Sequence, residues 1–317
     1  MDNGFAGRLS CPGGISMRLQ CKFSMVIVFI FIISAPPAVA MDTDVIRSDE
    51  VIVRFEKPLR DVALEVTRIY PSVRRELETA LQSGIGFIPE VILMSDREKF
   101  LNIAGNRLVV AVAVPGKNLI VIDNSEMKTF PYSLRVTLKH ELSHLLLHEH
   151  VGKGELPRWL NEGIAQWVSG GMAEILSGKG QAVLEKAVLS GRLIPIRELT
   201  LGFPDDAQLL RLSYEESRSF VEYIIKKSGI QGILGILNNL RDGDGIDTAV
   251  IRAVSIPLYE LEAEWHEYLR RKFTWFVYFS SRIYEIIFAV GALFLVYGFI
   301  KVLIRKRAYK DTEDEDE

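Results

Sequence analysis

The stretch "TLKHELSHLLL", Thr137–Leu147, holds two histidines four residues apart, with a glutamate directly after the first. On an α-helix, residues i and i+4 stand on the same face, so His140 and His144 can direct imidazole nitrogens at one point, where a metal ion can bind. Glu141 lies about 100° around the helix from His140, beside such an ion, where a general base for a water molecule belongs. The alternative interpretation is a leucine-rich core helix that happens to carry histidines.

The flanking sequence predicts that this stretch is helical. Pro131 precedes it and Gly152 follows it, which are typical start and stop residues. An apolar stripe runs along the face away from the histidine pair: Leu134, Leu138, Leu142 and Leu145. A helix is therefore expected, and the open question is whether it binds a metal.

A catalytic zinc ion usually has three protein ligands and one open position, so a third ligand is needed. His150 follows His140 by ten residues, but Leu147 replaces the turn glycine that such a spacing requires, so the helix would carry His150 away. Glu162, in "RWLNEGIAQWV" (158–168), lies on the next expected helix among apolar side chains. A glutamate on so apolar a helix needs a partner. Small neighbours, Gly163 and Ala165, would let the two helices approach closely.

The motifs "HELSH" and "WLNEGIA", at this separation, resemble those of the gluzincin zinc metallopeptidases, and within them the small peptidase MA-like domains of bacteria. Two downstream segments support the resemblance more weakly, "YEESRSFVEYI" (214–224) and "GIDTAVIRAVSIPLYELEAEWHEYLRR" (245–271). The resemblance covers roughly residues 50–271. It implies one catalytic zinc ion held by His140, His144 and Glu162, with Glu141 as general base and then general acid in peptide-bond hydrolysis.

The resemblance implies further roles. Tyr214 would stabilise the developing oxyanion, although a tyrosine that only packs on its helix is an equal alternative. The edge strand within 108–123 would bind extended substrate. One position departs from the family pattern: Gln166 stands where some gluzincins have an aspartate that orients the first histidine. Gln166 can accept the same hydrogen bond without charge, so metal affinity or activity would be lower.

Alternating and helical patterns predict an α+β fold, with a small mixed sheet lobe at about 50–130 and a helical lobe at about 131–271. Strands are expected at 50–55 and 89–94, and "PGKN" (115–118) predicts a hairpin between 108–114 and 119–123. A helical run covers 61–82, with Pro71 marking a kink or break.

The N-terminal 40 residues have the anatomy of a signal peptide: Arg18 and Lys22, the apolar run 23–33, and the small residues Ala38-Val39-Ala40. Met17 stands where such a peptide normally begins, so we expect residues 1–16 to be an overextended start. An uncleaved anchor is the alternative. Both cysteines, Cys11 and Cys21, precede the apolar run, so an exported domain at 41–275 would have neither disulfides nor thiolate ligands.

The C-terminal region predicts a transmembrane helix at 283–304, because 286–300 carries no charge and "RKRAYK" (305–310) follows. A buried core helix is the alternative. The positive flank predicts that 305–317 is a cytoplasmic tail, so the expected location is the bacterial inner membrane, with the catalytic domain on the exported side.

The overall charge of -3 gives no basic field for nucleic acid. The expected partners are a peptide or protein substrate and the membrane. Two rival functions use the same residues: a non-catalytic zinc-binding or scaffold protein that keeps the fold, and hydrolysis of a non-peptide bond. Retention of Glu141 speaks against the first, because a structural zinc site needs no base.

Overall fold

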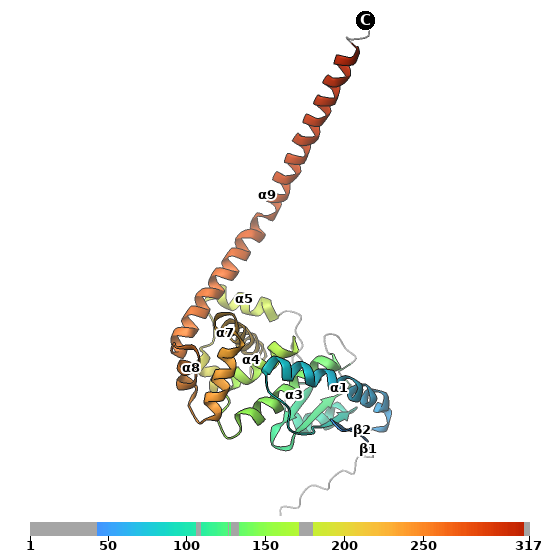
Figure 1. Ribbon diagram of the computed structural model, residues 1–317, viewed down its shortest axis with the longest axis vertical. Coiled ribbons are helices and arrows are strands. Elements are labelled where there is room, and N and C mark those ends of the chain that lie inside the picture. The colour runs from blue at the N-terminus through green and yellow to red at the C-terminus, as the bar shows by residue number, and fades with distance from the viewer. Residues whose placement is uncertain (1–42, 106–108, 126, 128–132, 171–179, 314–317) are drawn as a thin grey trace, which may run out of the picture. The chain divides into compact units, whose positions relative to one another are not determined.

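The computed structural model describes residues 43–313 except 106–108, 126, 128–132 and 171–179, with the backbone alone at 180–181, 275–284, 286 and 303–313 (Figure 1). The described part has a small sheet followed by helices, which confirms the predicted α+β class. The expected signal peptide and both cysteines lie outside the described residues.

The sheet has five strands in the order β1-β2-β3-β5-β4. Their bounds are Thr43–Arg47 (β1), Ile52–Glu56 (β2), Glu90–Met94 (β3), Ala111–Val114 (β4) and Leu119–Asp123 (β5). The three central strands are parallel, and β1 and β4 are antiparallel edges. The expected hairpin forms between β4 and β5 around a 3-10 turn at Pro115–Lys117. Strand β1 was not predicted.

Alternating side chains give the sheet two different faces. On β3, Val91 and Leu93 join the main core, where helices α1 (Arg60–Leu81) and α3 (Leu134–Val151) pack along the sheet (Figure 1). Met94, on the opposite face, packs with Phe100 of α2 (Arg97–Ala104). Helix α3 contacts both β4 and β5, so the sheet fixes the helix that carries the histidine pair.

The helical run predicted at 61–82 forms α1, Arg60–Leu81, which continues through Pro71 without a break. A proline inside a helix removes one backbone hydrogen bond and costs about 3 kcal/mol or more. Buried side chains on both sides of Pro71 offset that cost: Ala63, Val66, Tyr70, Val73 and Leu77.

The helical lobe comprises the helices after α3. They are α4 (Arg158–Ser169), α5 (Gly180–Ser190), α6 (Ile196–Leu201), α7 (Ala207–Arg241), α8 (Ile246–Val254) and α9 (Leu258–Glu313). Phe220 lies at the centre of their core, with its ring centroid 5.0 Å from that of Trp159 and 5.2 Å from that of Trp265. These buried rings join α4, α7 and α9, so α4 is fixed by the lobe's core.

The predicted transmembrane segment lies within α9. In the part of the chain that the structure describes, no helix is long and apolar enough to cross a membrane, so the span expected at 283–304 is not found there. The described side chains at 287–302 are almost all exposed, unlike Leu261 and Trp265 near the start of α9. The last residues of the expected tail, 314–317, lie outside the described part.

Candidate metal centre and substrate cavity

Helix α3 carries the histidine pair and the glutamate between them. It begins after Ser133 and ends at Val151, where Gly152, at φ 63°, caps it as expected. His140, Glu141 and His144 are all buried, although they are polar. Leu138, Leu142 and Leu145 are buried as the stripe predicts, so α3 is covered on both faces.

Helix α4 brings Glu162 beside them. The helix starts directly after Pro157, which cannot supply a backbone donor inside a helix. Gly163 does not face α3 as expected. A Cβ added there would meet Ser217 and Val221, so the glycine allows α4 to approach α7 instead. Gly163 therefore allows close packing of α4 on the helical lobe, while α4 also packs against α3.

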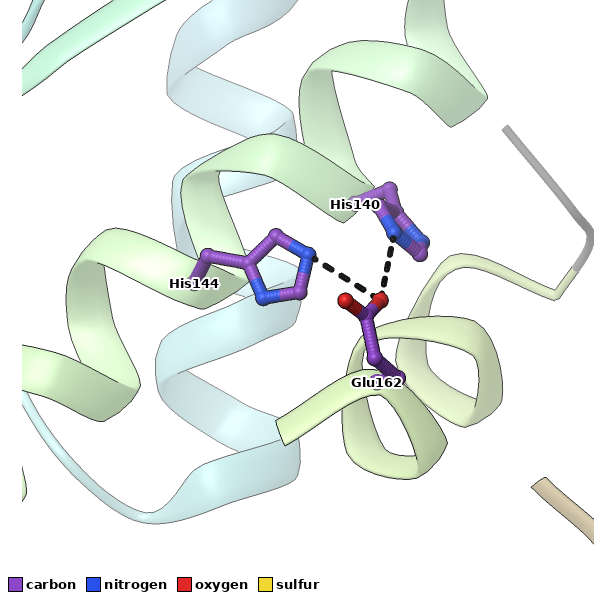
Figure 2. Close-up of side chains that lie close together, drawn as sticks. All are labelled: His140, His144 and Glu162. Atoms are coloured by element: carbon purple, nitrogen blue, oxygen red, sulfur yellow. Dashed lines mark ion pairs between the residues drawn. The ribbon is translucent and has the colours of Figure 1, made fainter. Parts of the chain in front are cut away.

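The side chains of His140, His144 and Glu162 converge on one point (Figure 2). Glu162 Oε2 lies 3.8 Å from His140 Nε2 and 3.6 Å from His144 Nε2. Zinc bonds of about 2.0–2.1 Å at tetrahedral angles place ligand atoms about 3.4 Å apart, so the two separations from Glu162 need to shorten by only a few tenths of an ångström. Two imidazoles and a carboxylate are also a donor set used for catalytic zinc. The residues present thus fit a zinc ion, and their role as ligands stays a prediction.

Asn161 orients one of these histidines. Its Oδ1 lies 2.9 Å from His144 Nδ1. The amide oxygen can only accept, so Nδ1 carries the proton and the lone pair of Nε2 is free to bind a metal. Asn161 was not predicted as a site residue, although it stands directly before Glu162 in "WLNEG".

A cavity of about 250 Å³ opens beside this cluster. Glu141, His144 and Glu162 line it from the two helices, and edge strand β4 forms another wall through Ala111, Val112 and Ala113. The remaining lining residues are Ala104, Val109, Pro115, His148, Arg158, Asn161 and Tyr214. The predicted base, two of the predicted ligands and the edge strand therefore share one cavity.

A larger cavity, of about 450 Å³, lies between the α3–α4 loop, the end of α6 and the α7–α8 turn. It is lined by none of the predicted site residues. The smaller cavity is the better candidate for the chemistry, because two of the three potential metal ligands, His144 and Glu162, line it together with the possible base Glu141.

Tyr214 of α7 is buried and lines the cavity, where the sequence analysis expects an oxyanion donor. Its ring packs edge-on against Phe203 at 5.1 Å. Both of its predicted roles, oxyanion donor and packing residue, are compatible with this position.

The hydrogen bond expected from Gln166 to the first histidine is not seen. Gln166 Nε2 instead donates to the backbone carbonyl oxygen of Tyr214, at 2.9 Å, and Gln166 Oε1 is buried without a hydrogen-bond partner among the described residues. Gln166 therefore joins α4 to the turn of α7 that carries Tyr214, a role that sequence spacing does not reveal.

The other histidines of α3 lie apart from the cluster. His150, the rejected third ligand, has Nε2 3.0 Å from Asn238 Oδ1 and Nδ1 3.4 Å from Ser83 Oγ. His148 lines the cavity, and burial, aided by nearby His144, lowers its pKa below the ordinary value. Neither belongs to the group of potential ligands.

No curated protein matches the chain. A solved structure of yeast LTA4 hydrolase in complex with bestatin is similar over 73% of this chain and 37% of that one, at 12% identity and a TM-score of 0.42. This chain therefore spans little more than a third of that protein. The family model of the Peptidase MA superfamily matches residues 105–271, which include β4, both motif helices and Tyr214. The chain belongs to the Peptidase MA superfamily.

Proposed function

We propose that this protein is a zinc-dependent peptidase of the gluzincin type. The observation that carries the proposal is the convergence of His140, His144 and Glu162 within 4.8 Å, beside a cavity that His144, Glu162 and Glu141 line. A structural zinc site would need the three ligands alone. A buried carboxylate beside them, open to a substrate-sized cavity, is what metal-assisted hydrolysis requires in addition.

Each group at the site has a different role in the proposed hydrolysis. A zinc ion bound here would polarise the peptide carbonyl and lower the pKa of a water molecule. Glu141 takes the proton from the attacking water at its carboxylate and passes it to the leaving amine, so no covalent intermediate with the protein is needed. Tyr214 is our candidate donor to the developing negative charge at the carbonyl oxygen.

Strand β4 gives the substrate a place to bind. It is an edge strand, hydrogen-bonded to β5 on one side, and three of its residues line the cavity. An extended peptide can add to such an edge through main-chain hydrogen bonds, which recognise any sequence. A peptide or protein substrate therefore suits this cavity better than a small molecule.

Glu141→Gln tests the proposal. The change keeps the size of the side chain and removes its basicity, so we expect peptide hydrolysis to fall at least 100-fold while zinc content stays unchanged. Glu149→Gln, the same change on an exposed part of α3, is the matched control. Equal activity of the Glu141 variant and wild type would refute the assigned base. Zinc binding without any hydrolysis by the wild type would favour the scaffold alternative.

We further propose that the catalytic domain acts on the exported side of a bacterial inner membrane, tethered by 283–304. The support is the sequence pattern alone: a signal-peptide pattern at 1–40 and an uncharged run followed by basic residues. Fractionation of cells that express the full-length protein tests this. Recovery in the soluble fraction, or release from membranes by alkaline carbonate, would contradict the tether.

A further inference from the structure

Some of the charged groups that line the cavity have a role in the proposed reaction, and one has none. Among its described lining residues, the acidic ones are Glu141 and Glu162, and the proposed function gives both a role in the reaction itself. No further carboxylate is left there to bind a free amino group of a substrate. Arg158 lines the same cavity and has no role in the proposed hydrolysis.

The guanidinium group of Arg158 is held in place but keeps its hydrogen-bond donors. Its Nε lies 3.9 Å from Glu162 Oε1, which is an ion pair but too long for a hydrogen bond. Among the described residues, no acceptor makes a hydrogen bond to it. The side chain is 46% exposed, so it can contact a ligand in the cavity.

One aromatic ring lies beside this group, and a second packs on the first. Arg158 Cζ lies 4.8 Å from the ring centroid of Phe203, and the Phe203 ring packs in turn on Tyr214. The three residues come from α4, the α6–α7 segment and α7, so they form a wall built by distant parts of the chain. Stacking on an aromatic ring restricts an arginine and so lowers the entropy that it loses when it binds a ligand.

We propose that Arg158 is a specificity-determining residue that binds a carboxylate of the substrate. A planar guanidinium with free donors matches a carboxylate through two parallel hydrogen bonds. The carboxylate can come from an acidic side chain near the scissile bond or from the C-terminus of a short peptide. This inference rests on the proposed peptidase function and adds the class of substrate that the cavity prefers.

The test compares Arg158→Gln and Arg158→Lys with wild type in the full-length, zinc-loaded protein. The substrates are matched fluorogenic peptides with Glu, Gln or Lys beside the cleaved bond, each with a free or an amidated C-terminus. Arg218→Gln is the control, because Arg218 pairs on the exposed side of α7 with Glu222.

We expect Arg158→Gln to lower kcat/KM about 10–100-fold for the peptides with the recognised carboxylate, the range for losing a hydrogen-bonded charge. The neutral, amidated peptide should change less than about threefold, with unchanged zinc content, and Arg158→Lys should restore only part of the preference. If Arg158→Gln lowers kcat/KM more for the Glu peptide than for the Gln peptide, the carboxylate that Arg158 binds is on a side chain. If the loss of kcat/KM is larger for peptides with a free C-terminus than for amidated peptides, Arg158 binds the C-terminal carboxylate.

An equal loss on all peptides, or a lower zinc content, would overturn the inference and make Arg158 a positioning residue for Glu162. So would the absence of any preference for acidic peptides in the wild type. Binding of the same peptides to zinc-loaded Glu141→Gln protein separates this inference from the proposed function. Arg158-dependent binding of acidic peptides without hydrolysis by the wild type would refute the peptidase activity and leave the assigned recognition intact.

Discussion

Replacing Gly163 by alanine should weaken both the fold and the metal centre, because this glycine lies where α4 crosses α7. The new Cβ would lie 2.7 Å from Val221 Cγ2 and 2.8 Å from the carbonyl carbon of Ser217, and closer still to that carbonyl oxygen. Ordinary contact begins at 3.4 Å. The Val221 side chain can rotate, but the Ser217 backbone cannot, so the two helices must separate by at least about 0.6 Å.

Overpacking of this kind costs about 1–3 kcal/mol, and each kcal/mol lowers the Tm of a domain of this size by about 2–4 °C. Glu162 is the adjacent residue, and a shift of this size exceeds the tolerance of about 0.2 Å on metal–ligand distances. We therefore expect a lower Tm together with weaker zinc binding, measured by calorimetry and by competition with a chelator. Gly84→Ala is the control, because nothing lies within 4 Å of a Cβ at that position. A Gly163→Ala protein with the Tm and zinc affinity of the wild type would refute the reasoning.

Three further predictions concern other residues. Asn161→Ala removes the acceptor that fixes the tautomer of His144, so zinc affinity should fall about 10–100-fold in the same competition assay. Burial, with help from a neighbouring carboxylate, raises the pKa of Glu216 to about 8 from 4.5, so the folded protein retains a proton that the unfolded chain loses. The free energy of unfolding should therefore fall as the pH rises from about 4.5 to 8, by at most about 1.4 kcal/mol per pH unit, and Glu216→Gln should remove that fall in melting curves. His150→Ala should leave zinc affinity unchanged and cost about 1 kcal/mol of stability, because its contacts lie elsewhere.

Each of these predictions has a contradicting outcome. Unaltered zinc affinity in Asn161→Ala would mean that the hydrogen bond does not select the tautomer. Parallel pH profiles of wild type and Glu216→Gln would mean that this carboxyl group titrates normally. Loss of zinc in His150→Ala would mean that His150 is a zinc ligand.

Local geometry explains what the sequence could predict. The i, i+4 spacing of His140 and His144 determines that they share a helix face, whatever the rest of the chain does. The alternation at 50–55 and the turn residues between β4 and β5 act over similarly short distances. These features were found from the sequence because each depends on a few neighbouring residues.

Contacts between distant segments explain what was missed. Gly163 was expected to face α3, but it faces Ser217, and the direction of a small residue depends on which helix packs there. Gln166 was assigned to a histidine and instead binds the backbone at Tyr214. Neither partner can be identified from spacing, because many residues of α7 were equally available.

Pro71 shows how packing acts on a local rule. A proline in a helix predicts a kink or break, and the buried residues on both sides of Pro71 stabilise a helix that continues through it. The cavity beside the candidate metal centre could not be predicted from the sequence either, because its walls come from β4, α3, α4 and α7. Arg158 gained a candidate role only when the structure brought it to that cavity.

The most direct test of the account is the zinc content of the full-length protein, measured by mass spectrometry of metals after dialysis against a weak chelator. We predict about one zinc ion per chain in the wild type and sharp loss in both His144→Ala and Glu162→Ala, with folding checked by circular dichroism. A well-folded wild type with no bound zinc, or full zinc retention in Glu162→Ala, would contradict a metal centre built by α3 and α4.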